Sequence, residues 1–380
     1  MTEESDVTEA EAEADPTFDW RLLTIEEAED LNDAESTVLP VAYSGQDFDV
    51  NGLVRRLNSD DILVPTFGHQ DSRIASAGFQ RSFVWNRPQM DRFIESLLLG
   101  YPIPGIFLVR QSDRRYLVLD GQQRLRTLQY FYRGIYDSKE FALANVASAF
   151  KGLTYEKLSE EQRRLIDDAF IQATIVSTDG TSESLESIFQ IFERLNSGGT
   201  QLTPHEIRVA LFAGPFIDYL EGLNRDPAWR ALYGKHNPRL RDQELVLRIL
   251  ALYLNADNYR RPLKSFLNDF VSSHRTLGGF DSDAARGLFG LAAELIRAET
   301  GPEALRRQGA QINAAMTETI FVGLMRRIDS RNALGSEEVE RAIRTLQQNE
   351  RLQQVISRAT ADEESVKTRL EIGTRVFAEV

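Results

Sequence analysis

The feature that most constrains the fold of this 380-residue chain is a change of periodicity near Pro215. Before it, short apolar runs of strand-like composition alternate with helical segments, and after it only helical periodicity recurs. The later helical segments are 242–254, 263–273, 284–300, 311–328, 336–357 and 365–380. No pattern repeats at a fixed period, which disfavours a solenoid. We therefore predict an α+β protein, with a mixed α/β domain at residues 41–214 and an all-helical domain at residues 215–380.

Several elements of the mixed domain have clear start and stop signals. Pro88 and Gly100 bracket an amphipathic helix, and a polar turn joins two apolar runs that we expect to pair as antiparallel strands. The expected strands and further elements are the runs 102–110 and 116–120, a helix at 52–57, a strand ending at Pro65, a capping box at Ser159 and Gln162, and a strand at 170–177. Residues 66–78 are interpreted as an exposed insertion.

The best-marked helix follows Thr203. We expect Thr203 to be its N-cap, Pro204 to occupy the first helical position and Glu206 to complete a capping box. Gly214 is predicted to terminate it.

The net charge of −14 is concentrated in an N-terminal leader. Residues 1–35 contain fourteen acidic residues and one basic residue, so the rest of the chain is nearly neutral. An acidic, apolar-poor segment of this kind favours a solvated, disordered leader at residues 1–40; a docking or nucleic-acid-mimicking role is the alternative. The total charge therefore argues neither for nor against a nucleic-acid partner.

The composition excludes several kinds of chemistry. Cysteine is absent, which excludes disulfides, thiolate metal sites and thiol nucleophiles. No apolar run is long enough to span a membrane, and the N-terminus lacks the basic start and apolar centre of a signal peptide. We therefore expect a cytoplasmic protein with no membrane partner.

The stretch YLVLDGQQRLRTLQYF, beginning at Tyr116, predicts a strand that turns on one glycine into a helix. The free backbone N–H groups of the first helical turn would form an anion site, which Gly121 lets a ligand approach closely. Arg124 adds a permanent charge suited to phosphate oxygens. Asp120 can orient Arg124, bind magnesium through water or act as a general base.

A purely structural interpretation of this turn stays open. Asp-Gly at a strand-to-helix turn is common, with the acid as N-cap and glycine supplying a positive φ. Two further polar interruptions favour a functional interpretation, namely Gln80 and Arg81 in an apolar run, and Arg194 and Asn196 before a Ser-Gly-Gly loop that could form a backbone nest for phosphate. Each interruption also has a purely structural interpretation. Arg81 could be a strand residue that points into solvent, and Arg194 and Asn196 could simply end a helix before a flexible connector.

The ordered segments FQRSFVW, ESLLLGYPIP, LDGQQRLRTL and FERLNSGGTQLTPHEIR resemble the DGQQR domain of the GmrSD-type modification-dependent restriction family. The resemblance implies a fold related to ParB and sulfiredoxin from about Val50, followed by a helical half. It also implies nucleoside triphosphate binding and hydrolysis, with Mg²⁺, in defence against foreign DNA.

The resemblance implies a set of site residues. Those expected to be catalytic are Asp120, Gln123 and Arg124, with Asp120 as the candidate magnesium ligand. Those expected to bind the nucleotide are Gln80, Arg81, Gly121, Gln122, Arg194, Asn196, Ser197, Gly198 and Gly199. The 66–78 insertion departs from the family pattern and leaves the ligand preference open.

Many members of this family carry an HNH nuclease half, which needs paired histidines and acids around a metal. The four histidines of this chain are isolated in sequence, so we expect a separate nuclease or other effector to cut DNA. The leading hypothesis is therefore a nucleoside triphosphatase module that regulates such an effector in a restriction or anti-phage system.

Two alternative functions stay open. One is a ParB-like DNA-binding module without significant hydrolysis, which would use basic residues of the helical domain: Arg239, Arg241, Arg260, Arg261, Lys264, Arg326, Arg327 and Arg331. The other is metal-dependent DNA nicking at Asp120. The long amphipathic helices after Asp242 are also compatible with a homodimer.

Overall fold

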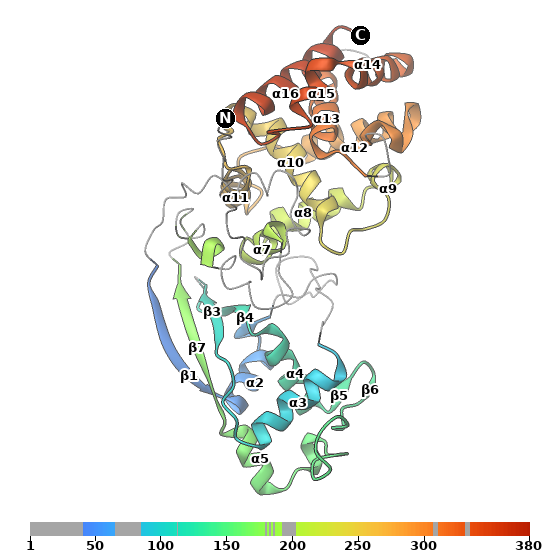
Figure 1. The fold of residues 1–380 in the computed structure, drawn as a ribbon. Helices are drawn as coiled ribbons and strands as arrows, with labels where there is room; N and C mark the ends of the chain where they lie inside the picture. Colours follow the sequence, from blue (N-terminus) through green and yellow to red (C-terminus); the bar gives the residue numbers. More distant parts are fainter. Residues whose placement is uncertain are drawn as a thin grey trace, which may run out of the picture.

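The computed structural model describes residues 41–64, 85–111, 113–178, 181, 184, 187–191, 203–306, 311–330 and 335–380. A mixed α/β lobe is followed along the chain by a lobe made of helices (Figure 1). The expected order of a mixed half and a helical half is therefore confirmed. The leader at 1–40 and the 66–78 insertion lie outside the described residues.

A five-stranded sheet forms the centre of the first lobe, with strand order β1-β7-β3-β4-β2. Its strands are β1 (Tyr43–Asp49), β2 (Ile62–Leu63), β3 (Ile106–Arg110), β4 (Tyr116–Asp120) and β7 (Phe170–Ser177). The predicted antiparallel pairing of β3 with β4 is confirmed, while β3 with β7 and β2 with β4 are parallel pairs. Strand β1 was not predicted, because it is an edge strand in which only Phe48 is buried and it therefore has no apolar alternation.

Helices cover one face of this sheet. They are α2 (Val50–Asn58), α3 (Arg87–Leu98), α4 (Gln122–Arg133) and α5 (Glu160–Asp167). Alternate strand residues face them, so Val118 packs in this core, whereas Leu117 and Leu119 join the cluster on the other face. That second cluster continues into the helical half. The sheet is therefore buried on both sides.

Local capping chemistry sets several helix starts. The predicted capping boxes of Ser159 with Gln162 and of Thr203 with Glu206 are confirmed, and Asn86 with Gln89 forms a third that was not predicted. The prediction for Gly214 is wrong, because α7 (Pro204–Leu211) ends before it, and Gly214 instead lies at the N-cap of α8 (Pro215–Asn224). Pro215 cannot donate a backbone hydrogen bond, so it suits the first position of a new helix.

The second lobe contains only helices apart from one isolated bridge, Arg306 to Ile312, among the residues the structure describes. Its α-helices after α8 are α9 (Pro227–Tyr233), α10 (Arg241–Asn255), α11 (Leu263–His274), α12 (Ser282–Glu299), α13 (Ala314–Asp329), α14 (Ser336–Gln348), α15 (Glu350–Val355) and α16 (Glu363–Ala378). The short helices α8 and α9 and the small hairpin of β5 (Ile135–Tyr136) and β6 (Lys139–Glu140) were not predicted. Within the described ranges, no helix has the length and apolar character needed to cross a membrane.

Candidate phosphate site at the start of helix α4

Strand β4 ends at Asp120, and α4 begins two residues later, with Gly121 between them. Gly121 is the N-cap in the left-handed region, with φ 95°, and no side chain caps the helix. The first backbone N–H groups of α4 therefore have no capping oxygen from a side chain. The purely structural interpretation, in which Asp120 is the N-cap of this helix, is therefore wrong, because Gly121 holds that position.

Gly121 is required here for space as well as for backbone conformation. A Cβ at this position would lie 2.4 Å from Ile106 Cγ2 and 3.4 Å from Arg124 Nη2. An alanine would therefore collide with a buried strand residue in addition to adopting an unfavourable φ. The glycine lets the start of α4 lie directly against β3.

A change of register precedes the turn. Leu108 pairs with Val118, but the neighbouring Phe107 pairs with Asp120, so Leu119 is the extra residue of β4. Such a β-bulge redirects the following side chain and is frequent beside functional sites. Here it comes directly before Asp120.

Asp120 and Arg124 form an ion pair at this turn. Arg124 Nη2 donates to Asp120 Oδ2 at 2.8 Å and to the backbone oxygen of Gly105 at 3.0 Å. The Asp120 side chain is 51% exposed and that of Arg124 is 15% exposed. The carboxylate therefore orients the guanidinium, as expected from the sequence, at the uncapped end of the helix. Arg124 Nε is buried and has no hydrogen-bond partner within the described part of the chain.

The next residues of α4 contact both chain ends that flank residues 65–84. The side-chain oxygen of Gln123 accepts from the backbone N–H of Trp85 at 3.2 Å. Arg126 Nη2 donates to the backbone oxygen of Val64 at 3.3 Å. Gln122 is half-buried in the same turn. The contact of Arg126 with Val64 was not predicted, because the two residues are 62 positions apart in sequence.

The other predicted nucleotide-binding residues lie outside the described residues. They are Gln80, Arg81, Arg194, Asn196, Ser197, Gly198 and Gly199. Their convergence with the start of α4 therefore stays a prediction. The described flanks are Trp85, bonded to Gln123, and Thr203, which caps α7.

A buried polar cluster around His205 follows the predicted Ser-Gly-Gly loop at residues 197–199. His205 Nε2 lies 3.0 Å from Gln243 Oε1, and Arg208 Nη1 lies 3.2 Å from His205 Nδ1. Because an arginine can only donate, Nδ1 accepts and Nε2 carries the proton. Burial lowers the pKa of His205 to about 4, and the opposing effect of Glu244 is smaller. This cluster connects α7 to α10. It was not predicted from the sequence, because each of its residues alone is an ordinary residue of a helix.

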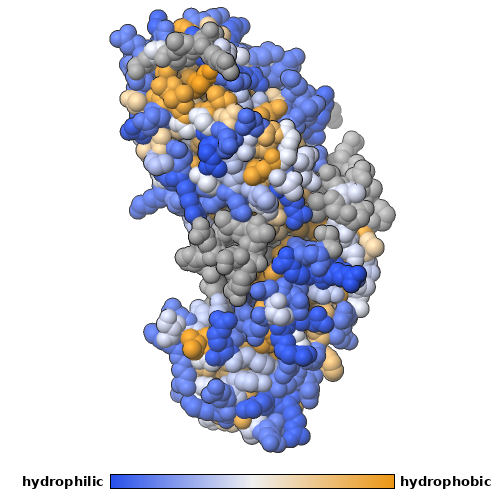
Figure 2. Space-filling view, turned by 180° about the vertical axis from the view of Figure 1, so that it is seen from behind, coloured by the Kyte–Doolittle hydropathy of each residue, from blue (hydrophilic) through white to orange (hydrophobic). Residues whose placement is uncertain are grey.

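The basic residues considered for DNA binding that the structure describes contact other groups of the protein. Arg239 pairs with Glu206 at 3.3 Å, and Arg241 pairs with Glu244 at 3.0 Å. The others that the structure describes contact the following groups: Arg260 the oxygen of Tyr259, Arg261 the carboxylate of Asp362, Lys264 the ring of Phe189, Arg326 the hydroxyl of Thr374 and Arg327 the oxygen of Val380. Arg331 lies outside the described residues. Figure 2 shows hydrophilic surface over much of both lobes, interrupted by hydrophobic areas.

The described residues contain no group of three or more His, Cys, Asp or Glu side chains that could hold a metal ion. Of the histidines, His205 is buried, His236 lies beside Asp242, and His274 packs on Phe270. His69 lies outside the described residues.

Residues 66–213 match the family model described as GmrSD restriction endonuclease, N-terminal domain. This match confirms the resemblance read from the sequence motifs over that part of the chain, and it connects the chain to a restriction-system family. No curated protein and no solved structure matches significantly.

Proposed function

We propose that this chain binds a nucleoside triphosphate at the start of α4 and hydrolyses it, as the regulatory component of a restriction-type defence system. The observation that supports it best is the pairing of an uncapped helix N-terminus with an oriented arginine. Backbone N–H groups and the helix dipole favour phosphate oxygens, and Arg124 adds a positive charge held by Asp120 and the oxygen of Gly105.

The fit to Mg²⁺ rests on the half-exposed carboxylate of Asp120. Magnesium in nucleotide sites is commonly held by one or two carboxylates together with substrate phosphates and waters. Asp120 Oδ2 accepts from Arg124, so Oδ1 is the oxygen that would face the ion or a water bound to it. When bound, the ion would neutralise developing charge on the phosphates.

Hydrolysis would place each group in a definite role. Water attacks the terminal phosphorus, the bond from that phosphorus to the bridging oxygen breaks, and the diphosphate leaves with the bond electrons. The water proton passes to Asp120 or to solvent, while Arg124 and the backbone N–H groups of α4 hold the phosphate oxygens. Gln123 is positioned beside them by its bond to Trp85.

The experiment measures binding of ATP, GTP, CTP and UTP, and phosphate release from each, with and without Mg²⁺. Arg124→Ala should weaken binding by roughly 10- to 100-fold, because a hydrogen bond to a charged group contributes about 1.5–3 kcal/mol. Asp120→Ala should reduce phosphate release more than binding. Arg133→Ala is the matched control, since Arg133 is an exposed arginine at the other end of the same helix. Failure of the wild type to bind any of these nucleotides would refute the proposal.

The DNA-binding alternative is less well supported, because the basic residues described above already contact protein groups. Its test is the salt dependence of binding to duplex DNA, which falls steeply when many phosphates are contacted. The nicking alternative is tested with supercoiled plasmid and Mg²⁺ or Mn²⁺, comparing the wild type with Asp120→Ala.

A further inference from the structure

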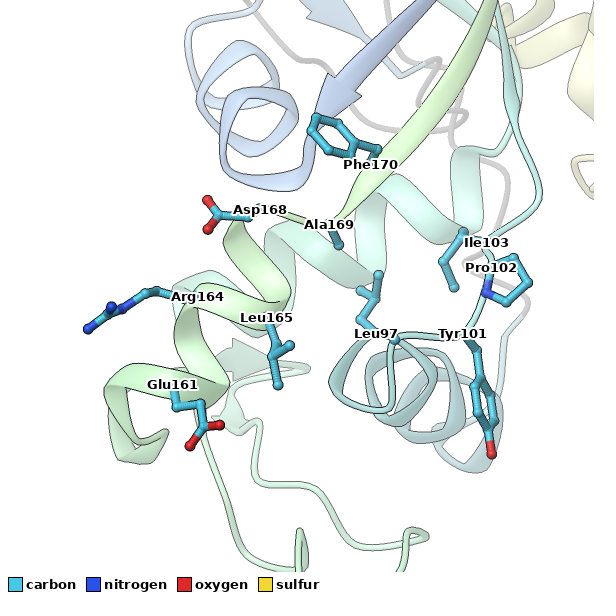
Figure 3. Close-up of a pocket in the computed structure, with 11 residues that line it drawn as sticks. Leu97, Tyr101, Pro102, Ile103, Glu161, Arg164, Leu165, Asp168, Ala169 and Phe170 are labelled. Atoms are coloured by element: carbon cyan, nitrogen blue, oxygen red, sulfur yellow. The ribbon is translucent and has the colours of Figure 1, made fainter.

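A groove of about 580 Å³ opens on the α/β lobe between the end of α3, the segment Tyr101–Ile103 and the end of α5 (Figure 3). Leu97 and Leu165 face each other across it. Three of the eight large hydrophobic side chains that are exposed among the described residues line it: Tyr101 (59%), Leu165 (47%) and Phe170 (70%). An exposed apolar patch rimmed by polar groups is typical of a protein-binding surface.

The rim of this groove is electronegative. Glu161 of α5 and Asp168, the C-cap of that helix, line it, and the basic residue there, Arg164, is paired with Glu160 at 2.9 Å. Helices α3 and α5 both end at the groove, and helix C-termini carry partial negative charge. The last turn of α3 contains no basic residue that would offset it. A cationic side chain is therefore complementary, and the fourteen acids of residues 1–35 are not.

The segment that lines one side of the groove leads along the chain toward the start of α4. Gly105 follows Tyr101–Ile103 after one proline and packs on β7, two residues beyond Phe170. A Cβ at Gly105 would lie 2.9 Å from the backbone oxygen of Gln172. The backbone oxygen of Gly105 in turn accepts from Arg124. Pro102 and Pro104 fix two φ angles of the connecting segment, which limits the conformations it can adopt.

We propose that this groove docks a segment of a partner protein that presents apolar side chains together with a lysine or arginine, and that docking changes nucleotide affinity through Gly105 and Arg124. The apolar side chains pack against the exposed Tyr101, Leu165 and Phe170, and the cation lies on the acidic rim formed by Glu161, Asp168 and the two helix ends. The coupling to nucleotide rests on the proposed function; the docking itself does not.

Docking is tested by selection from a random 12-residue peptide library displayed on phage, with the wild-type chain as bait and Phe170→Asp for counterselection. We expect enriched peptides to combine apolar residues with lysine or arginine. Their affinity should fall at least tenfold for Leu165→Asp and stay unchanged for the control Leu291→Asp, another exposed leucine, on α12. The variants change exposed side chains, and circular dichroism verifies that each is folded.

Charge reversal at the rim distinguishes electrostatic recognition of the peptide from nonspecific apolar binding. The double variant Glu161→Lys, Asp168→Lys should prefer acidic peptides, whereas Glu371→Lys, at an exposed position of α16, should keep the wild-type preference. No enrichment over the Phe170→Asp bait, or enrichment of acidic peptides by the wild type, would overturn the docking proposal.

Coupling is measured as the dissociation constant of the bound nucleotide with and without saturating peptide. By linkage, nucleotide must change peptide affinity by the same factor, which we expect to be several-fold. An unchanged nucleotide affinity in the presence of bound peptide would refute the coupling and leave docking intact. Absence of any nucleotide binding would refute the proposed function and its coupling, while docking is decided by the peptides.

Discussion

Arg124 uses one nitrogen, Nη2, to contact both Asp120, four residues earlier, and the backbone oxygen of Gly105, on the segment before β3. The first contact lies within one helical turn and the second links α4 to the neighbouring strand. Arg124 therefore has a structural partner as well as a position suited to phosphate. Stability measurements separate these two roles.

Asp120→Ala should change the free energy of unfolding by less than about 1 kcal/mol, because the Asp120 side chain is half-exposed and its ion pair is screened. Arg124→Ala should lower it by about 1–3 kcal/mol, because the largely buried guanidinium also bonds to Gly105. Urea denaturation measures both. Equal losses for the two variants would contradict this assignment, and Arg133→Ala should stay within about 0.5 kcal/mol of the wild type.

Gly121→Ala should destabilise the protein more than Gly134→Ala. Both glycines have positive φ, which costs an alanine about 1–2 kcal/mol. A Cβ at Gly121 also collides with Ile106, whereas one at Gly134 meets nothing within 4 Å. Overpacking adds about 1–3 kcal/mol, so the difference between the two variants should be of that size. Similar denaturation midpoints would show that the strand relaxes away from Gly121.

Removing the acid of a buried ion triad should destabilise the helical lobe strongly. Glu318 accepts from Arg248 at 2.5 Å and from Arg369 at 2.6 Å, and all three side chains are nearly inaccessible to solvent. Glu318→Ala leaves two buried guanidinium groups without their carboxylate, so we expect a loss of about 3–5 kcal/mol. Thermal and chemical denaturation measure it.

The matched control for the triad is Glu340→Ala, which removes the partner of Arg344 on the exposed face of α14. It should change the free energy of unfolding by less than about 1 kcal/mol. A comparable loss at both sites would show that the triad contributes no more than a surface pair.

His205 should make the protein less stable below neutral pH. Its pKa is lowered to about 4 in the folded state by burial, against 6.5 ordinarily, so the unfolded chain binds the proton more readily. Stability is then fully present above pH 6.5 and is lost as the pH falls toward 4, by about 3 kcal/mol in total. Denaturation at pH 7.5 and pH 5 should show a smaller difference for His205→Gln than for the wild type. An identical pH dependence for the two proteins would contradict it.

The sequence by itself determined the features whose cause lies within a few residues. The capping boxes at Ser159 and Thr203, the turn at Gly121 and the antiparallel pair of β3 and β4 follow from local backbone chemistry and short apolar runs, and the structure confirms them. Gly214 was misread because a glycine can end one helix or precede the next, and only the chain path decides between them.

Only the tertiary structure decided the contacts between distant residues. Arg124 meets Gly105, nineteen positions away in sequence, because the start of α4 packs on β3, and Glu318 meets Arg248 because α10 and α13 pack together. No sequence pattern predicts either contact, because the neighbours of each polar residue in sequence do not identify its partner. The partners meet only when the apolar faces of their helices and strands pack together. The same packing places the exposed groove beside the segment that leads to Gly105, whose backbone oxygen accepts from Arg124. The sequence therefore predicted which residues form the candidate site, and the fold shows what holds Asp120, Gln123 and Arg124 in place.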